Sequence, residues 1–259
     1  MKTLTTIADV RAALAAEGDA TVGLVPTMGA LHRGHVSLLE AARAESDRVV
    51  ASIFVNPAQF SAGEDLARYP RDPERDAAVA AAAGVDILFV PEADEMYAPG
   101  YQTWVEVDEL SKRLEGAFRP GHFRGVATVC LKLFNIVRPQ RAYFGQKDAQ
   151  QAAVLRRMVK DLNLELELRV LPTVRDDDGL ALSSRNAYLS AEERARALAL
   201  PRALQTRDAR RAHEVLTAAG VDVDYVDVLD GDGDAVLAAA VRVGSTRLID
   251  NVPLKGETT

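Results

Sequence analysis

The sequence of 259 residues contains a single cysteine, Cys130, and only four histidines. One cysteine excludes an internal disulfide framework, and so few cysteines and histidines leave little material for a structural zinc site. No apolar stretch approaches the roughly 18 residues needed to cross a bilayer, and the N-terminus has acidic residues and no long apolar core, unlike a signal peptide. We therefore expect a cytoplasmic protein with no membrane partner.

Basic residues are in the minority. The chain has 31 lysines and arginines against 38 aspartates and glutamates, a net charge of −7, whereas nucleic-acid binders usually show a basic excess or patch. We therefore expect small-molecule partners and no nucleic acid. Two familiar nucleotide signatures are also missing, since the sequence has neither a GxxxxGK[ST] loop nor a GxGxxG motif after its first strand.

Apolar segments of strand length alternate with helical patterns through the first two thirds of the chain. Continuous apolar strands separated by helices are typical of a parallel sheet covered on both faces. Strands are predicted at 21–26, 48–56, 85–91, 141–145 and 167–172, and helices from Gly34 onward, at 72–84, at 128–139 and at 148–163. We predict an α/β fold with a doubly wound, Rossmann-like domain over residues 1–173, whose ligands bind beyond the carboxyl ends of the strands.

The pattern changes after Leu171, where the turn-rich acidic segment PTVRDDDG begins. We expect a smaller C-terminal α+β lid domain over residues 174–259. Ser190 and Glu193 have the spacing of a capping box and predict a helix at 191–204. A strand at 221–230, a short helix at 234–241 and a last strand at 246–254 complete the prediction.

The segment VPTMGALHRGHVSLLEAAR, residues 25–43, joins an apolar strand to a helix. A helix N-terminus offers unpaired backbone amides and about half a unit of positive charge, so the turn from Gly29 to Gly34 is suited to phosphate. His32 and His35 add donors for phosphate oxygens whose charge grows in a transition state. The same pair could instead be a solvated cap and a core imidazole, and its three-residue spacing does not favour a metal site.

The pattern PTMGALHRGH resembles the HIGH signature of the nucleotidylyl transferase superfamily, whose members direct an attack on the α-phosphate of ATP. Four more segments occur in the order found in the pantothenate synthetase, or pantoate/β-alanine ligase, family: SIFVNPAQF at 52–60, RPGHFRGVATV at 119–129, YFGQKDAQQ at 143–151 and DGLALSSRNAYLS at 178–190. GSTRLIDN follows near the C-terminus. The resemblance spans residues 22 to 252, and the sequence is identified as a member of that family.

The resemblance implies a two-step ligation. The carboxylate of (R)-pantoate attacks the α-phosphate of Mg-ATP, which gives pantoyl adenylate and pyrophosphate, and the amine of β-alanine then displaces AMP to form pantothenate. Mg²⁺ would be held mainly through the ATP phosphates, with no metal site of the protein's own. Lys147, a compact charge, and Arg185, whose guanidinium can hold two oxygens, would offset the remaining repulsion between the carboxylate and the triphosphate. The family also implies a homodimer.

The catalytic residues implied by the resemblance are His32, His35, Lys147, Ser183, Ser184 and Arg185. Of these, His35 is the expected acid or stabilising donor, and residues 183–185 look like the family's version of the flexible KMSKS loop. The residues expected around ATP are Met28, Gly29, Ala30, Leu31, His32, Arg33, Gly34, His35, Gly145, Gln146, Lys147, Asp148, Val174, Leu182, Ser183, Ser184 and Arg185. Asp148 is suited to the ribose hydroxyls. Leu182 stands where the family commonly has methionine, a swap that conserves volume.

Pantoate and β-alanine are expected to bind to the neutral amides of Gln59 and Gln151, which can both donate and accept hydrogen bonds. The other residues expected there are Pro26, Met28, Phe54 and Asn56. Without the resemblance, Gln151 would be interpreted as an exposed helix position. An acyl adenylate hydrolyses if water reaches it, so residues 61–72, which are polar and follow Gln59, are the candidate gate. His122 is expected to pack beneath the site or to orient a loop, and a catalytic role for it is the less favoured alternative.

Three other functions stay open at this point. The protein could be an adenylyltransferase that keeps AMP on its product. A tRNA-charging enzyme is disfavoured by the acidic charge and the small C-terminal region. A nucleotide-binding regulator without chemistry is disfavoured by the joint presence of His32, His35, Lys147 and Arg185.

Overall fold

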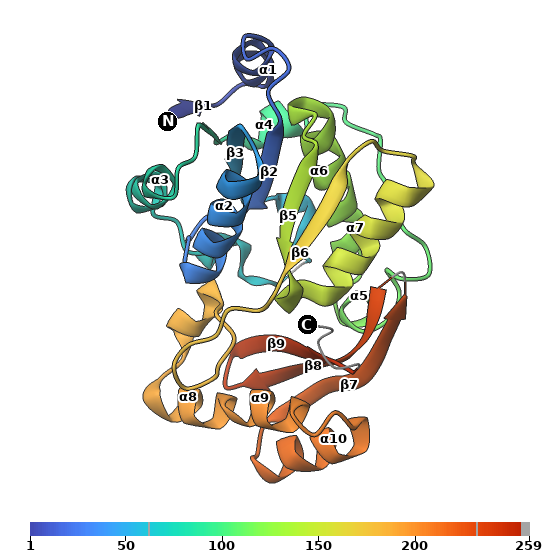
Figure 1. Ribbon diagram of the computed structural model, residues 1–259. Helices are drawn as coiled ribbons and strands as arrows, with labels where there is room; N and C mark the ends of the chain where they lie inside the picture. The colour runs from blue at the N-terminus through green and yellow to red at the C-terminus, as the bar shows by residue number, and fades with distance from the viewer. Residues whose placement is uncertain (62, 232, 255–259) are drawn as a thin grey trace.

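The computed structural model describes residues 1–61, 63–231 and 233–254, and these residues form two sheets with their covering helices (Figure 1). The larger sheet has six parallel strands in the order β1-β4-β3-β2-β5-β6. Its strands are β1 (Lys2–Leu4), β2 (Val22–Thr27), β3 (Arg48–Ile53), β4 (Ile87–Phe89), β5 (Arg141–Gly145) and β6 (Glu167–Leu171). The predicted doubly wound α/β fold is confirmed.

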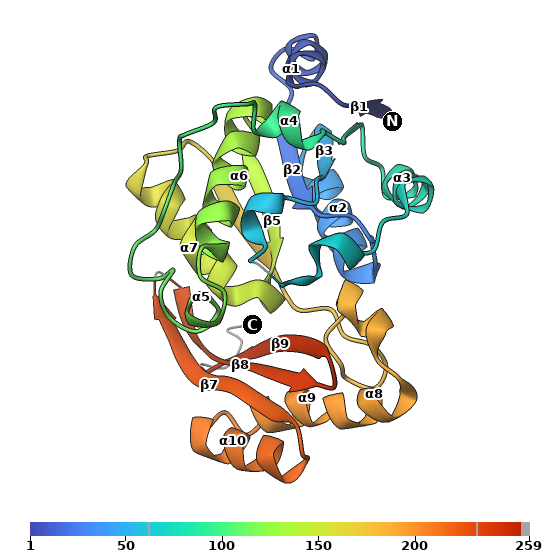
Figure 2. The ribbon, with the colours of Figure 1, turned by 180° about the vertical axis from the view of Figure 1, so that it is seen from behind.

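Helices cover both faces of this sheet, as Figures 1 and 2 show from opposite sides. One face is packed by α1 (Ile7–Ala15), α6 (His122–Val137) and α7 (Ala149–Asp161), and the other by α2 (Arg33–Glu45) and α3 (Pro73–Ala82). Successive residues of a strand point to opposite faces, so Leu24 lies in the first core and Val25 in the second. Burial on both faces explains why the central strands are apolar throughout.

The direction of winding reverses at β2. This strand lies between β3 and β5, and the helix that follows β2 packs on the opposite face from the helix that follows β5. The loops leaving β2 and β5 therefore diverge, and such a switch point opens a crevice outside the carboxyl ends of the strands. The short elements around this crevice are η1 (Pro57–Gln59), η2 (Asp65–Arg68), α5 (Glu115–Phe118) and η3 (Gln146–Asp148). The short helix α4 (Ala93–Met96) lies away from it, beside α1, where Glu95 accepts from Ile7 N (Figure 1).

Two helices differ in extent from the sequence prediction. Helix α6 begins at His122 rather than at residue 128, because Gly121 adopts a left-handed conformation (φ 82°) and starts the helix six residues earlier. The helix predicted at 191–204 is divided into α8 (Ala191–Ala197) and α9 (Ala199–Leu204). Pro201 accounts for the division, since its ring would clash with the carbonyl of Ala197 in a continuous helix. The capping box of Ser190 and Glu193 is confirmed.

The smaller sheet is antiparallel and consists of β7 (Asp222–Gly231), β8 (Gly233–Val243) and β9 (Thr246–Pro253). Helices α8, α9 and α10 (Ala209–Ala218) cover one of its faces, and the other face is turned toward the larger sheet (Figure 1). The predicted helix at 234–241 is wrong, because these residues belong to β8. Leu237 and Ala239 lie in the helical core while Val236 and Ala238 face the other way, and a short apolar run buried on both faces has no periodicity that distinguishes strand from helix.

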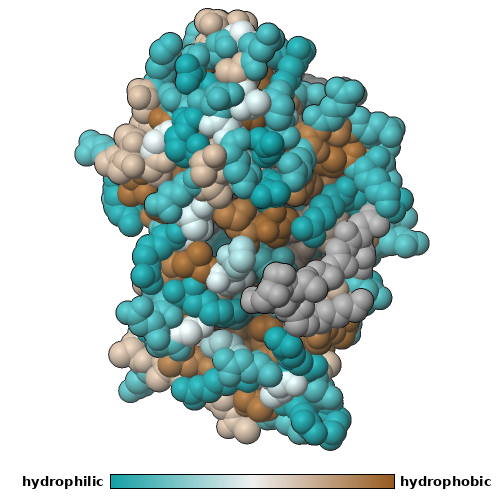
Figure 3. Space-filling view, viewed as in Figure 1, coloured by the Kyte–Doolittle hydropathy of each residue, from teal (hydrophilic) through white to brown (hydrophobic). Residues whose placement is uncertain are grey.

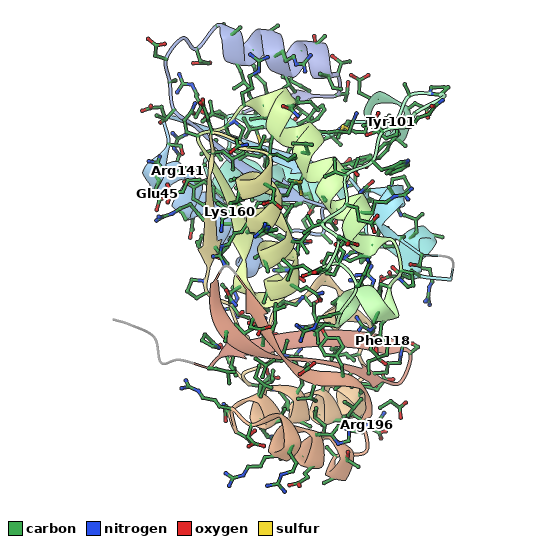
Figure 4. All side chains as sticks on the ribbon, turned by 90° about the vertical axis from the view of Figure 1, so that its right-hand side faces the viewer. Glu45, Tyr101, Phe118, Arg141, Lys160 and Arg196 are labelled. Atoms are coloured by element: carbon green, nitrogen blue, oxygen red, sulfur yellow. The ribbon has the colours of Figure 1, made fainter. Side chains whose placement is uncertain are left out.

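The part of the molecule that is built on the larger sheet contacts the part that is built on the smaller sheet. We call this region of contact, across the middle of the molecule, the waist. In Figure 4 the labelled Phe118 lies at this waist, where its ring centroid is 5.9 Å from that of Tyr225 on β7. The face shown in Figure 3 is mostly hydrophilic, with several apolar patches near the waist. In the parts of the chain that the structure describes, every helix is too short or too polar to cross a membrane.

Candidate active site

A cavity of about 230 Å³ opens at the switch point, beyond the carboxyl ends of β2, β3 and β5. Loops from the large sheet form most of its wall, and the segment from Pro172 to Arg185 closes one side. The residues that the sequence placed at the site and that line this cavity are Pro26, Met28, His32, Gly34, His35, Phe54, Asn56, Gln59, Gly145, Lys147, Asp148, Gln151, Val174, Leu182, Ser183, Ser184 and Arg185. Segments far apart in the sequence thus converge on one point.

Three of the remaining predicted residues form the turn after β2, and their amides already have partners. Ala30 N and Leu31 N donate to the carboxylate of Asp76 on α3, at 2.8 and 2.7 Å, and Gly29 N donates to Thr27 Oγ1 at 3.1 Å. The expectation that this turn offers unpaired amides to phosphate is therefore wrong for these three groups. A buried carboxylate requires donors, and Asp76, 1% exposed, finds them in this turn.

Asp76 also explains the unusual backbone of the turn. Gly29 and Ala30 have φ values of 84° and 51°, a region that costs a non-glycine residue about 1 kcal/mol or more. A Cβ atom on Gly29 would lie 2.9 Å from Asp76 Oδ2. Sequence reasoning missed Asp76, and its signal is a lone aspartate at a core-facing position of the alanine-rich helix α3.

Arg33 and Gln146 are the other two predicted residues outside the cavity lining. Arg33 Nη2 lies 3.2 Å from Asp176 Oδ1, and Gln146 Nε2 donates to Asn251 Oδ1 at 3.0 Å. Both side chains therefore contact the C-terminal part of the chain, at the rim of the crevice.

The two histidines stand at the start of α2 with their rings 4.0 Å apart between centroids. His32 is the N-cap, and its Nδ1 accepts from Gly34 N at 3.1 Å, while His35 Nδ1 accepts from His32 N at 3.3 Å. A nitrogen that accepts from an amide carries no proton, so each neutral ring bears its proton on Nε2. A Cβ on Gly34 would lie 2.9 Å from His32 Cε1, so the glycine makes room for this capping ring.

The surroundings keep both imidazoles neutral. Burial lowers the pKa of His35 to about 3, with further contributions from His32 and the positive charge of Lys147. Burial, followed by Lys147, lowers the pKa of His32 to about 4. At neutral pH the pair therefore presents N–H donors without cationic charge.

Positive charge enters the site from two loops. Lys147 follows β5, and its Nζ lies 3.6 Å from Asp148 Oδ1. Arg185 lies in η4 (Ser184–Tyr188), where Ser183 Oγ caps the helix by accepting from Arg185 N at 3.2 Å. The two cations approach the cavity from the large sheet and from the segment that leads to the small sheet, so any anion between them would contact both parts of the chain.

The structure describes Ser61 and residues 63–72 of the predicted gate. This segment contacts Arg119 and Arg185. Asp65 accepts from Arg185 Nε and Nη2 at 2.9 and 2.8 Å, and Glu64 accepts from Arg119 Nε and Nη2 at 2.9 and 2.7 Å. A second cavity of about 600 Å³ lies beside these pairs and shares Arg119, Lys147 and Arg185 with the first. Bidentate pairs between arginine and carboxylate have a fixed geometry, so the gate is held across the crevice by two carboxylates.

The amide of Gln59 is held in a defined orientation. Asn56, which is 1% exposed, donates through Nδ2 to Gln59 Oε1 at 3.1 Å and to the carbonyl of Gly125 at 3.2 Å. The Nε2 group of Gln59 is thereby directed to the cavity wall, where it lies 2.8 Å from Met28 Sδ. A Cβ on Gly125 would lie 2.2 Å from the carbonyl oxygen of Ala58. Gly125, which sequence reasoning missed, allows η1 to pack on α6.

His122 lines the cavity and contacts the loop that carries Gln59, so its position agrees with both expectations for this residue. Arg119 Nη1 lies 3.1 Å from His122 Nε2, and because arginine only donates, Nε2 is the acceptor. His122 Nδ1 then donates to the carbonyl of Gln59 at 2.8 Å. Burial, and secondly Arg119, lowers the pKa of His122 to about 4. The imidazole is a buried link between Arg119 and η1.

Comparison with known proteins gives one consistent result. Residues 2–253 match the model of the family described as pantoate-beta-alanine ligase. The pantothenate synthetase of Acidobacterium capsulatum is 56% identical, with 93% of this chain and 88% of that protein covered, and that of Moorella thermoacetica is 54% identical, with coverages of 98% and 99%.

Two solved structures agree with these relatives. The crystal structure of pantothenate synthetase from Thermus thermophilus has a TM-score of 0.93 at 49% identity and covers 98% of this chain and 99% of its own. That of pantoate-beta-alanine ligase from Francisella tularensis, complexed with beta-gamma ATP and beta-alanine, has a TM-score of 0.89 at 35% identity and covers 98% of each chain.

Proposed function

This chain belongs to the pantoate-beta-alanine ligase family and condenses pantoate with β-alanine in an ATP-dependent reaction, and we propose that the residues lining the switch-point cavity carry out this reaction in two steps. In the first step the pantoate carboxylate attacks the α-phosphate of ATP, the bond to the β-phosphate breaks, and pyrophosphate leaves, which gives pantoyl adenylate. In the second step the amine of β-alanine attacks the acyl carbon of pantoyl adenylate, AMP leaves, and pantothenate is released.

The first step must bring two anions together. We infer that pantoate binds against Gln59 and Gln151, whose amides hold its hydroxyl and carboxylate oxygens. Lys147 and Arg185 face the triphosphate and offset the repulsion between carboxylate and phosphate, which is large in a site that excludes water. Asp148 receives the ribose hydroxyls, and Val174 and Leu182 pack against the base.

Neutral donors replace an acid catalyst in this proposal. With pKa values lowered to about 4 and 3, His32 and His35 carry no extra proton to give at neutral pH. Their Nε2–H groups instead donate hydrogen bonds to the α-phosphate oxygens, on which negative charge increases during the attack. Because both rings are already held by backbone amides, little reorganisation accompanies the reaction.

Mg²⁺ fits this site as a companion of ATP. Among the described residues there is no group of three or more His, Cys, Asp or Glu side chains that could hold a metal ion, and Asp148 offers one carboxylate beside Lys147. We propose that the ion is held mainly by phosphate oxygens, because Mg²⁺ commonly binds through one or two carboxylates and substrate phosphates. When bound, it supplies neutralisation of phosphate charge.

The gate acts through an exchange of anions. Asp65 and Glu64 occupy Arg185 and Arg119 in the structure, and a triphosphate entering the crevice competes for the same guanidinium groups. We infer that the gate shifts when Arg185 turns to phosphate and that it closes again over the adenylate. In this proposal residues 174–259 act as the lid domain. We also propose that the protein is cytoplasmic and forms a homodimer.

One observation carries the assignment of roles: His32, His35, Lys147 and Arg185 line a single cavity with Gln59 and Gln151. The test is exchange of labelled pyrophosphate into ATP, which should require pantoate, with AMP released only after β-alanine is added. A stable adenylylated product would instead favour the adenylyltransferase alternative.

The His35→Ala variant tests the donor pair. Exchange should fall about a hundredfold, and His213→Ala is the matched control because His213 is exposed on α10, away from the cavity. Exchange by His35→Ala at the rate of the His213→Ala control would exclude His35 from the mechanism.

A further inference from the structure

Asp250 and Asn251 are adjacent on β9 and almost fully buried, with exposures of 2% and 3%. They end the segment GSTRLIDN, to which the proposed mechanism gives no role. Buried carboxylates and amides are expensive unless they have hydrogen-bond partners. Their partners therefore show what this part of the strand does.

Asn251 contacts the loop that carries Lys147. Its Nδ2 donates to the carbonyl oxygens of Gln146 and Lys147, at 2.8 and 2.9 Å, and its Oδ1 accepts from Gln146 Nε2 at 3.0 Å. One primary amide thus satisfies two consecutive carbonyls and one side-chain donor. Among ordinary side chains only Asn and Gln combine two donors with an acceptor in this way.

Asp250 contacts a second loop. Its carboxylate pairs with Arg175 Nη1 and Nη2, at 2.6 and 3.0 Å. Arg175 starts a short hairpin that is closed by a bridge to Ala181, and the next residues along the chain lead to Arg185. Neighbouring residues of one strand therefore hold the loop that carries Lys147 and the loop that leads to Arg185.

We propose that Asn251 is a positioning residue for adenylation, which fixes the η3 loop so that Lys147 meets the triphosphate at the correct place. The inference rests on the role proposed above for Lys147. Only residues 146–148 separate β5 from α7, and the amide of Asn251 holds the carbonyls of the first two. Because Asn251 belongs to the small sheet, the position of Lys147 depends on how the two sheets dock.

Loss of this amide should act mainly on the rate. Without it two carbonyls of the η3 loop lose a buried donor, and an error of about 1 Å at a group that contacts the reacting atoms can reduce catalysis a hundredfold. We therefore expect Asn251→Ala to lower kcat/KM for ATP in pantoate-dependent pyrophosphate exchange by about a hundredfold. Asn251→Asp, which retains the acceptor and loses both donors, should behave similarly.

The decisive measurement combines Asn251→Ala with Lys147→Ala. If Asn251 acts through Lys147, the double variant is no slower than Lys147→Ala alone, because the cation to be positioned is already gone. Val252→Ala is the matched control, since Val252 is the next residue on β9 and packs against the core of the small sheet. It should lower the melting temperature and leave the kinetics of exchange unchanged.

Three results would overturn the inference. Independent losses that multiply in the double variant would show that Asn251 does not act through Lys147. A kinetic effect of Asn251→Ala no larger than that of Val252→Ala would show a structural role only. Normal exchange by Lys147→Ala would refute the proposed role of the lysine itself, and with it the inference. Should Asn251→Ala fail to fold, Asn251→Ser, whose hydroxyl still donates to one carbonyl, takes its place in the same cycle.

Discussion

Asp76 is the buried group on which the turn after β2 depends, and Asp76→Asn tests this dependence with almost no change in volume. The carboxylate accepts from Ala30 N and Leu31 N at 2.8 and 2.7 Å and is 1% exposed. An asparagine retains one oxygen acceptor and turns an NH₂ group toward the other amide. One charge-assisted hydrogen bond is lost and one buried N–H is left unsatisfied, which together destabilise the fold by about 2 kcal/mol.

This loss should appear in both stability and activity. A destabilisation of about 2 kcal/mol corresponds to a fall in melting temperature of about 4–8 °C for a protein of this size. The left-handed backbone at Ala30 also loses the hydrogen bond to the carboxylate that stabilises it. His32, two residues further along the chain, is therefore held less firmly. We expect kcat/KM for ATP to fall by up to about a hundredfold.

The matched control is Glu74→Gln, which removes an exposed carboxylate from the same helix. It should change neither the melting temperature nor the kinetics of pyrophosphate exchange. The reasoning is refuted if Asp76→Asn matches this control in both measurements, because the carboxylate would then contribute nothing to the turn. A fall in melting temperature with normal kinetics would refute only the link to His32.

Three further predictions concern substrate binding and pH. Gln151→Ala should raise KM for pantoate about tenfold in steady-state assays and leave KM for ATP nearly unchanged; equal changes would contradict the assignment. Gly125→Ala places a Cβ 2.2 Å from the carbonyl oxygen of Ala58, so it should destabilise the protein by about 1–3 kcal/mol and raise KM for pantoate selectively. His32 and His35, with pKa values of about 4 and 3, should contribute no titration to kcat/KM between pH 6 and 8. Because the unfolded chain takes up protons on these histidines near pH 6.5, the melting temperature should fall as the pH drops from 6.5 toward 4. In the kinetic assay, a change in kcat/KM that titrates near pH 6.5 would show that one of the two histidines is protonated there.

Local sequence patterns were sufficient to predict much of the part of the chain that forms the larger sheet. Strands that are apolar throughout, such as residues 22–25, indicated a sheet buried on both faces, and their alternation with helices indicated parallel order. The position of the site followed from the same pattern, because ligands of doubly wound sheets bind beyond the carboxyl ends of the strands. The motifs then named most of the side chains that line the cavity.

Local patterns were misleading where a segment is buried on both sides or where a backbone group has a distant partner. The run at 234–241 could not be assigned from periodicity, and tertiary packing made it strand β8. The amides of Ala30 and Leu31 were counted as free, since nothing near them in the sequence indicates the carboxylate of Asp76, which lies 45 residues beyond Leu31.

The sequence by itself determined the fold class, the family and the residues expected to meet substrate, because these depend on periodicity and on short motifs within single segments. Only the tertiary structure decided which groups hold those residues in place. Asp76 beneath the turn, Gly125 beneath η1 and Asn251 on the second sheet each act across long stretches of chain. The physical reason is that a buried polar group is satisfied by whatever the fold brings within about 3 Å, and this distance in space has no counterpart in the order of residues along the chain.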